Sequence, residues 1–163
     1  MRSEPRSGCA INAAVEVLGD SWSLIVLRDI VFGNRRHFRE LLTLNDEGIA
    51  SNMLSSRLKK LVDEGLLTRA DTVRGQKAAY SLTEAGIEVV PVMVALGTWG
   101  VTHRPTSPEL TIRSRILAES PVLVADLMDE LRENHLGVTL PESPRSRASE
   151  RLRAAYEAEI GRA

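Results

Sequence analysis

Apolar residues recur at helical spacing through the first part of the chain, where glycines and short polar runs divide them into segments. The clearest segment has Leu54, Leu58, Leu61 and Val62 at positions i, i+4, i+7 and i+8, which lie on one side of a helix. Similar spacing between polar or glycine ends indicates three shorter helices before it. The predicted helices span residues 11–18, 22–32, 37–44 and from 50 or 51 to 64.

The pattern then changes period. Residues 66–69 and 78–82 predict two short strands on either side of residues 74–77, a glycine-containing hairpin tip. Thr83 can cap a further helix, in which Pro91 predicts a kink or a break. Helices followed by a two-stranded hairpin are typical of a winged helix-turn-helix, so the expected fold is mainly α with a small two-stranded β wing and flanking dimerisation helices.

The chain after residue 103 is organised differently. Residues 104–108 predict a linker, residues 121–134 an amphipathic helix and residues 146–160 a highly charged last helix. We therefore expect a winged helix-turn-helix domain over residues 1–104 and a helical extension over residues 105–163. Its apolar stripe favours extension of a dimer interface over covering of an effector pocket, because no convergent polar cluster accompanies it.

Composition indicates an ordinary globular protein. The 163 residues are 43% hydrophobic and 26% charged, which argues against wholesale disorder. A single cysteine cannot form an internal disulfide, and the polar residues 1–8 have no apolar signal core. The apolar stretches look too short to cross a bilayer. We therefore expect a cytoplasmic protein with no membrane partner.

Charge is unevenly distributed although the net charge is −1. Residues 35–77 contain six acidic side chains, whereas residues 105–163 contain ten acidic and eight basic ones. A phosphate-binding surface needs local charge rather than a basic whole. The nine basic residues of the first segment are Arg35, Arg36, Arg39, Arg57, Lys59, Lys60, Arg69, Arg74 and Lys77.

Signatures of enzymes and metal sites are absent from the sequence. Residues 33–36 lack the glycines and the Lys-Ser/Thr ending of a phosphate loop, and no Gly-x-Ser-x-Gly elbow occurs. His37, His103 and His135 have no neighbours of ligand type at zinc-site spacing. We predict that the protein is not an enzyme and that it uses no cofactor or metal.

The segment 51–64 carries the functional hypothesis. If its leucines face inward, Asn52, Ser56 and Lys59 lie on the opposite face, with Ser55, Arg57 and Lys60 along the edges. Short hydrogen-bonding side chains with cations behind them suit a helix in the DNA major groove. The alternative is an ordinary solvated face, which the basic hairpin tip after the helix makes less favoured.

The same residues resemble the HxlR-type regulators, a branch of the bacterial MarR-like winged-helix transcription factors. The resemblance covers roughly residues 9–100. It rests on Cys9-Ala10, Leu18-Gly19-Asp20-Ser21-Trp22-Ser23-Leu24, Leu27-Arg28-Asp29, Arg36-His37-Phe38-Arg39-Glu40-Leu41, Gly48-Ile49, Leu54-Ser55-Ser56-Arg57-Leu58, Gly65-Leu66-Leu67 and Tyr80-Ser81-Leu82-Thr83-Glu84-Ala85-Gly86.

This resemblance implies a homodimer on a pseudo-palindromic operator, with recognition helices one DNA turn, ~34–36 Å, apart. The chain departs from the usual family pattern with Ala50 and Asn52 near the start of the helix and with a wing that lacks proline. The residues predicted to bind double-stranded DNA are Arg36, Ser51, Asn52, Ser55, Ser56, Arg57, Lys59, Lys60, Arg74, Gln76 and Lys77.

Cys9 and the two tryptophans each allow two interpretations. Cys9 precedes the first helix, at the position where some relatives sense oxidants, and Arg6 is close in sequence. It is therefore a candidate redox sensor, and the alternative is a small apolar side chain at the dimer interface. Trp22 and Trp99 could line a ligand site, but packing between helices is favoured.

Taken together, the sequence predicts a sequence-specific, dimeric DNA-binding transcriptional regulator, a repressor whose operator affinity responds to a small-molecule or oxidant signal. The alternative is a winged-helix protein-interaction module that does not bind DNA. The basic surface of Arg36, Lys59, Arg74 and Lys77 distinguishes these two functions, because charge reversal there should abolish binding only if the ligand is DNA. A metal-responsive repressor is a third interpretation, opposed by the lack of a ligand set.

Overall fold

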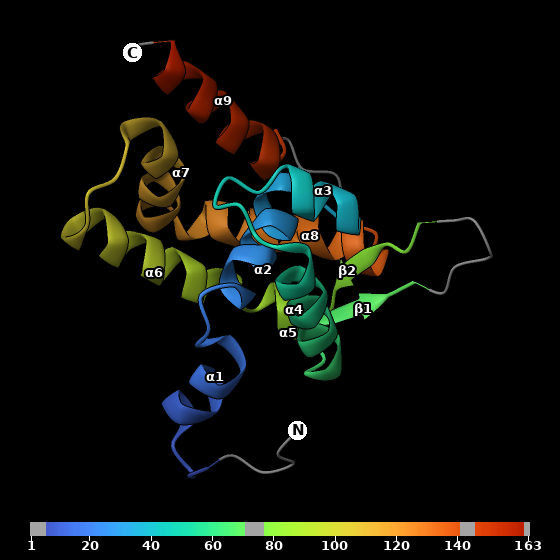
Figure 1. Cartoon of the computed structure of the whole chain (residues 1–163). Coiled ribbons are helices and arrows are strands. Elements are labelled where there is room, and N and C mark those ends of the chain that lie inside the picture. The colour runs from blue at the N-terminus through green and yellow to red at the C-terminus, as the bar shows by residue number, and fades with distance from the viewer. Residues whose placement is uncertain (1–5, 71–76, 141–145, 162–163) are drawn as a thin grey trace. The chain divides into compact units, whose positions relative to one another are not determined.

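The computed structural model of the chain describes residues 6–70, 77–140 and 146–161. Its helices and strands follow one another as drawn in Figure 1. They are α1 (Ala10–Leu18), α2 (Ser23–Gly33), α3 (Phe38–Thr43), α4 (Ser51–Asp63), β1 (Leu67–Arg69), β2 (Tyr80–Leu82), α5 (Glu84–Ile87), α6 (Val90–His103), α7 (Pro108–Glu119), α8 (Pro121–Leu136) and α9 (Ala148–Ile160).

The chain divides into two compact units, Met1–Gly86 and Ile87–Ala163. The second unit includes α6, which packs along α7. Gly97 of α6 permits this approach, because a Cβ there would lie 2.7 Å from the Oγ atom of Ser114. The division by compactness therefore falls before α6, whereas the functional division expected after residue 104 stays a prediction.

The core of the first unit forms where α2 meets α4. Leu27, Ile30, Leu54 and Leu61 are 0% exposed and Leu58 is 1% exposed. Burial of each such side chain contributes about 1.5–3 kcal/mol. The stripe of leucines predicted for α4 therefore does face inward, and it sets which side of this helix remains for solvent.

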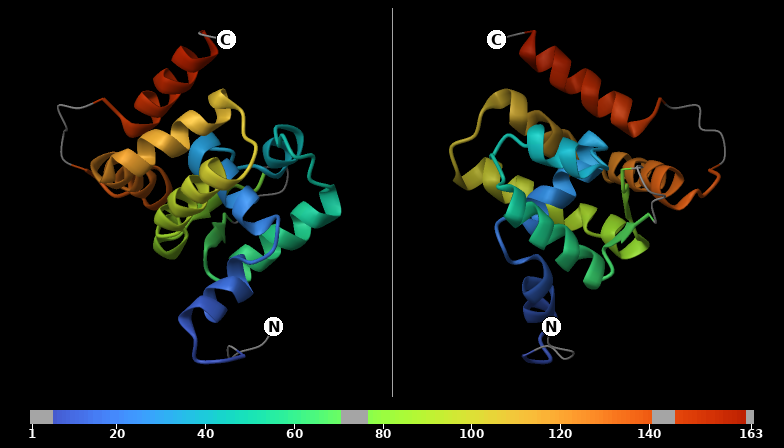
Figure 2. Two further views of the ribbon diagram at one scale, coloured as in Figure 1. Left: turned by 90° about the vertical axis from the view of Figure 1, so that its left-hand side faces the viewer. Right: turned by 45° about the vertical axis from the view of Figure 1, so that its right-hand side comes forward.

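The hairpin pairs β1 and β2 antiparallel, with Leu67 opposite Leu82 and Arg69 opposite Tyr80. Leu67 and Leu82 are buried, so this end of the wing joins the core. Helices α2, α3 and α4 followed by a two-stranded wing form a winged helix-turn-helix, as the sequence predicted. Figure 2 shows α1 projecting from the body of this unit, and α1 has no buried residue.

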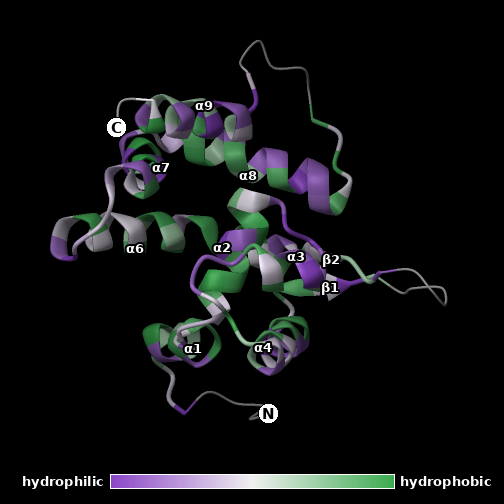
Figure 3. Cartoon of the chain, turned by 45° about the horizontal axis from the view of Figure 1, so that its top comes forward, coloured by the Kyte–Doolittle hydropathy of each residue, from purple (hydrophilic) through white to green (hydrophobic). Residues whose placement is uncertain are grey.

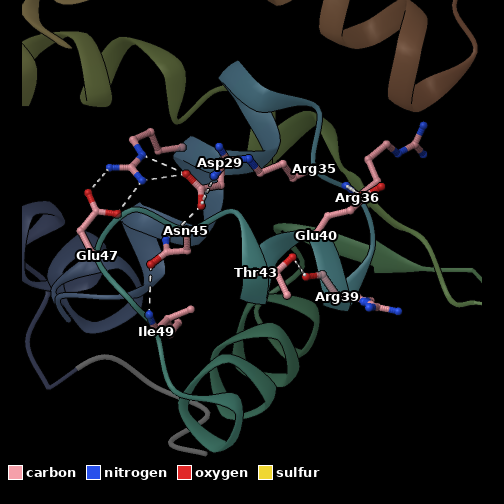
Figure 4. A network of polar contacts seen from close by, with 10 residues as sticks. Asp29, Arg35, Arg36, Arg39, Glu40, Thr43, Asn45, Glu47 and Ile49 are labelled. Carbon is pink, nitrogen blue, oxygen red and sulfur yellow. Dashed lines mark hydrogen bonds and ion pairs between the residues drawn. The ribbon is translucent and has the colours of Figure 1, made fainter.

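Asp29 of α2 connects this helix to the segment before α3 and to the turn between α3 and α4. It is 5% exposed, and its carboxylate lies between two guanidinium groups, 2.7 Å from Arg28 Nη2 and 3.1 Å from Arg35 Nη1. Asn45 Nδ2 donates a hydrogen bond of 3.0 Å to the same carboxylate, while Asn45 Oδ1 accepts one of 3.1 Å from the backbone N–H of Ile49. These contacts fasten the turn between α3 and α4 to α2 (Figure 4).

Arg28 extends this network to Glu47 through two hydrogen bonds, of 2.5 and 2.8 Å. Bidentate pairing of this kind stabilises both charged forms. The hydrogen bonds from Arg28 hold the pKa of Glu47 below its usual range, and the same contacts raise the pKa of Arg28. Both shifts favour the charged forms, so the pair stabilises the turn wherever Glu47 is ionised.

The segment after the wing follows the predicted cap and break. Thr83 Oγ1 accepts a hydrogen bond of 3.1 Å from the backbone N–H of Gly86, and the helix is interrupted between Ile87 and Val90, just before Pro91. The expectation that the apolar stretches are too short to cross a bilayer is wrong for Glu84–His103. By length and composition these 20 residues could cross a membrane, and only 22% of the most apolar window is buried.

The second unit contains one helix that the sequence did not predict, α7. The predicted cap and stop of α8 are confirmed, because Ser120 Oγ accepts from the N–H of Leu123 and Gly137 has a φ of 70°. The apolar stripe of α8 is already buried within the chain, at Leu123, Leu127 and Leu131. The dimer or effector role expected for the extension stays a prediction.

We expect the Glu47→Gln variant to lose about 0.5–1 kcal/mol of stability at neutral pH, because Glu47 is partly exposed and solvent weakens the pair. The pKa of Glu47 is lower in the folded than in the unfolded chain. Its contribution is therefore complete above its ordinary pKa of 4.5 and is lost as the pH falls below that value. Urea unfolding between about pH 7 and pH 3 measures the difference.

The matched control is Glu88→Gln, since Glu88 is exposed and makes no ion pair within the described ranges. This variant should follow the wild-type pH dependence. A Glu47→Gln variant with the same pH dependence as the wild type would contradict the assignment.

Candidate nucleic-acid interface

Helix α4 presents a polar surface on the side opposite its buried leucines. The exposed side chains in its first half are those of Ser51, Asn52, Ser55 and Ser56, and Lys59 follows one turn later. Gly48 precedes the helix with a φ of 71°, a conformation that a glycine adopts without strain. This surface has the short donors and acceptors that can reach base edges in a major groove.

Two of the predicted DNA-binding cations are held by an acidic side chain. Asp20, on the turn between α1 and α2, lies 2.8 Å from Arg57 Nε and 3.0 Å from Lys60 Nζ. Burial alone would raise the pKa of Asp20, but hydrogen bonds from Ser23 and Lys60 and from backbone N–H groups hold it well below its usual range. Arg57 and Lys60 are therefore paired with a carboxylate whose charged form is favoured.

The remaining cation of this helix is more accessible. Lys59 is 76% exposed and forms an i,i+4 pair of 2.6 Å with Asp63. Exposed pairs of this kind are worth little and exchange readily for another anion. Lys59 is thus accessible to solvent, and its contact with a phosphate stays a prediction.

Arg36, a predicted DNA contact, also makes contacts within its own chain. Its Nε donates a hydrogen bond of 3.2 Å to the carbonyl oxygen of Tyr80, and its Nη2 donates to Ser81 Oγ. Its backbone N–H donates to Glu40 Oε2. Arg36 consequently joins the segment before α3 to β2, and its contact with DNA stays a prediction.

The wing itself is described only in part. The predicted DNA contacts Arg74 and Gln76 lie outside the described residues. Lys77 is exposed. Two further cations, Arg39 on α3 and Arg69 on β1, are also exposed, and in the described part of the chain neither makes an ion pair. The site prediction omitted both, although the excess of basic residues over 35–77 included them.

The N-terminal arm places Cys9 in solvent. Cys9 is exposed at the N-cap position of α1. The nearby cation Arg6 pairs instead with Glu16, at 2.7 Å, and this hydrogen bond lowers the pKa of Glu16 to about 2. Among the residues that the structure covers, no cluster of three His, Cys, Asp or Glu side chains could hold a metal ion.

The two tryptophans differ from each other. Trp22 is half-buried beside α2. Trp99 of α6 is 52% exposed and is therefore not enclosed by helices of its own chain. The guanidinium carbon of Arg104 lies 4.9 Å from the centre of the Trp99 ring, and the His103 ring is 5.1 Å away. Trp99 is thus part of an apolar surface with a basic end.

Known proteins with related sequences are transcriptional regulators. The chain is 36% identical over 115 residues to the uncharacterized HTH-type transcriptional regulator Rv3095 of Mycobacterium tuberculosis, a match that covers 69% of this chain and 71% of that protein. It is 33% identical over 93 residues to the uncharacterized HTH-type transcriptional regulator sll1512 of Synechocystis, covering 56% and 67% of the two chains.

Solved structures agree with the fold. The crystal structure of PA1607, assigned as a transcription factor, matches with a TM-score of 0.56 and 30% identity over 63% of this chain and 70% of that chain. A MarR-family regulator from Porphyromonas gingivalis W83 matches with a TM-score of 0.51 and 24% identity over 63% and 99%. The family model described as HxlR-like helix-turn-helix matches residues 17–108, more than half of the sequence. The chain therefore belongs to the HxlR-like helix-turn-helix family.

Proposed function

We propose that the protein is a dimeric, sequence-specific DNA-binding regulator that represses transcription, with a small-molecule or oxidant signal that changes its affinity for an operator. The observation that carries this proposal is the exposed polar face on the first half of α4, within a winged helix whose relatives are transcriptional regulators. A helix with that surface can enter a major groove, while nearby cations contact the backbone.

The side chains divide into two groups by the contacts they can make. Asn52, Ser55 and Ser56 have the donors and acceptors that distinguish bases. Lys59, together with Arg39, supplies charge for phosphates without carrying sequence information. Arg69 and Lys77 extend this charge onto the wing. We assign base recognition to the first group and affinity to the cations.

The proposed dimer rests on two exposed apolar surfaces. In α1, Ile11 is 75% and Val15 is 51% exposed. In α6, Val92, Leu96 and Trp99 are each between 44% and 52% exposed, and Figure 3 colours most of this helix as apolar or neutral. Surfaces of this kind mark contacts with a partner. We assign the partner as a second copy rather than a bilayer, in keeping with a cytoplasmic regulator on a pseudo-palindromic operator.

The signal that would release the operator belongs to the same proposal. A change in the separation of two recognition helices, which in a bound dimer lie one turn of ~34–36 Å apart, would remove one of them from its groove. Cys9 is the candidate oxidant sensor, because its thiol is exposed at the start of α1. The extension after residue 104 is the alternative location for an effector or for further dimer contacts.

We expect Asn52→Ala to reduce discrimination between the operator and mismatched DNA by about 1–3 kcal/mol, roughly 5- to 150-fold, through loss of base contacts. An operator can be obtained by selecting from random duplexes with the wild-type protein, and fluorescence anisotropy then measures both affinities. Equal discrimination by the variant and the wild type would contradict the assignment. If the wild type selects no sequence and binds no duplex, a protein-interaction role replaces the proposal.

Arg39→Ala should instead weaken binding to every duplex and lower the slope of log affinity against log salt concentration by about 0.9, since one phosphate contact is lost. Arg115→Ala is the matched control, because Arg115 is an exposed arginine of α7 without an ion pair among the described residues. The control should retain the wild-type slope.

Leu96→Glu should separate the dimer, because a carboxylate buried in an apolar interface costs several kcal/mol. We expect the dimer Kd to rise on the order of 100-fold, measured by sedimentation equilibrium. The matched control is Leu110→Glu on α7, where the leucine is 65% exposed. If the dimer dissociated in the Leu110→Glu control but not in Leu96→Glu, the assignment of the dimer interface to α6 would be wrong.

Oxidant treatment should modify Cys9 and lower operator affinity. A single cysteine can form only an intermolecular or a small-thiol disulfide. Non-reducing electrophoresis, mass spectrometry and operator binding before and after treatment measure this, and Cys9→Ser should remove the response. No modified species and unchanged DNA affinity in the treated wild type would reject the sensor role.

A further inference from the structure

Asp20 is placed to act on the recognition helix although it is not part of it. It follows α1 by two residues and contacts α4 through Arg57 and Lys60. The distances are 2.8 Å from Asp20 Oδ1 to Arg57 Nε and 3.0 Å from Asp20 Oδ2 to Lys60 Nζ. All three side chains are only about a quarter exposed, at 24% for Asp20 and Arg57 and 25% for Lys60.

The charge of Asp20 exceeds what its structural role requires. Asp20 Oδ1 accepts hydrogen bonds of 3.0 and 2.9 Å from the backbone N–H groups of Trp22 and Ser23, and Oδ2 accepts one of 2.5 Å from Ser23 Oγ. These bonds hold the turn that leads into α2, and the uncharged amide oxygen of an Asn can accept the same two backbone hydrogen bonds. The negative charge therefore has a second consequence, which is to hold two cations.

Arg57 is held by charge rather than by a directed hydrogen bond. Its Nε is buried and has no aligned acceptor among the described residues, although the Asp20 carboxylate is 2.8 Å away. Because its Nε makes no aligned hydrogen bond to Asp20, the guanidinium breaks no such bond when it turns to another anion. Phosphate offers both negative charge and acceptors at suitable angles, so DNA backbone and Asp20 compete for the same group.

The position of the pair on α4 makes this competition relevant to binding. Arg57 follows Ser56, and Lys60 follows the 76% exposed Lys59. At 100° per residue, the two held cations lie along one edge of the polar face. A groove-bound helix has the DNA backbone beside its edges.

We propose that Asp20 is a positioning residue that withholds Arg57 and Lys60 from the DNA backbone, so that α4 binds with fewer phosphate contacts than its sequence contains. This inference rests on the proposed DNA-binding function. The physical consequence is weaker binding to arbitrary DNA, which leaves a larger share of the affinity to base contacts. Non-specific affinity comes essentially from phosphate contacts, whereas discrimination comes from base edges.

The decisive experiment neutralises Asp20 and retains an oxygen acceptor for the turn before α2. In Asp20→Asn, and independently in Asp20→Ser, binding to a labelled duplex of mixed sequence should tighten at low salt. The slope of log affinity against log salt should steepen by about 0.9–1.8, one contact for each released cation. Between about 50 and 200 mM salt the variants should thus lose about 3- to 12-fold more affinity than the wild type.

A matched control separates this effect from a change in net charge. Asp129→Asn alters the charge equally and removes one ion pair, that with Arg132, but it lies on α8. This control should keep the wild-type slope. A charge-only explanation predicts the same steepening for both variants, and that result would overturn the inference.

Arg57→Gln gives a second, independent readout. Added to the wild type, this substitution should change the slope of log affinity against log salt concentration little. Added to Asp20→Asn, it should reverse about 0.9 of the steepening, which corresponds to one phosphate contact. An Asp20→Asn protein that is folded by circular dichroism but binds with the wild-type slope, or more weakly, overturns the positioning role and leaves DNA binding intact. Failure of both the wild type and the variant to bind any duplex overturns the proposed function together with this inference.

Discussion

The buried carboxylate of Asp29 is the interaction on which the geometry of the helix-turn-helix depends. A charge that is 5% exposed is tolerated only when it is paired, and here the pairs come from Arg28, Arg35 and Asn45. These groups belong to α2, to the segment before α3 and to the turn before α4. Satisfying one charge therefore orders three parts of the chain at once, and loss of a partner would leave this buried carboxylate less well compensated.

Ion pairs with acidic residues thus determine which basic side chains remain available on the surface. The sequence between residues 35 and 77 contains nine basic side chains, but the fold occupies many of them. Arg35 pairs with Asp29, and Arg57 and Lys60 pair with Asp20. Fewer cations are left for a ligand than a count along the chain suggests, and they lie at other positions. This is why the proposed function includes Arg39 among the contacts with the DNA backbone and Arg69 on the wing.

The fold was largely predictable because its signals are local. The leucine stripe of α4, the cap at Thr83 and the stop at Gly137 each depend on residues within one or two turns. Helix α7 escaped prediction because its buried positions are Thr111 and Leu117, which do not form an apolar stripe. Its polar residues gave no periodic signal, and only packing reveals that they belong to a helix.

The site was less predictable because its chemistry depends on contacts between distant residues. The helical period placed Asn52 and Ser56 on the solvent side of α4, and burial of the opposite face confirms that placement. Nothing in the spacing of Arg57 indicates that its partner is Asp20, 37 residues earlier. The exposure of Trp99 could not be predicted from the sequence either. An apolar helix predicts burial, but it does not indicate whether the helix is buried by its own chain or by another.

The location of Asp20 connects association with recognition in physical terms. Helix α1 has no buried residue, carries the exposed Ile11 and Val15, and ends two residues before Asp20. An isolated helix of nine residues is marginal in water and needs packing to hold its position. In the proposed dimer, a second copy that covered α1 would lie close to the turn that carries Asp20. The two proposals are then linked, because the contact that brings two recognition helices together would also adjoin the charge that holds Arg57 and Lys60.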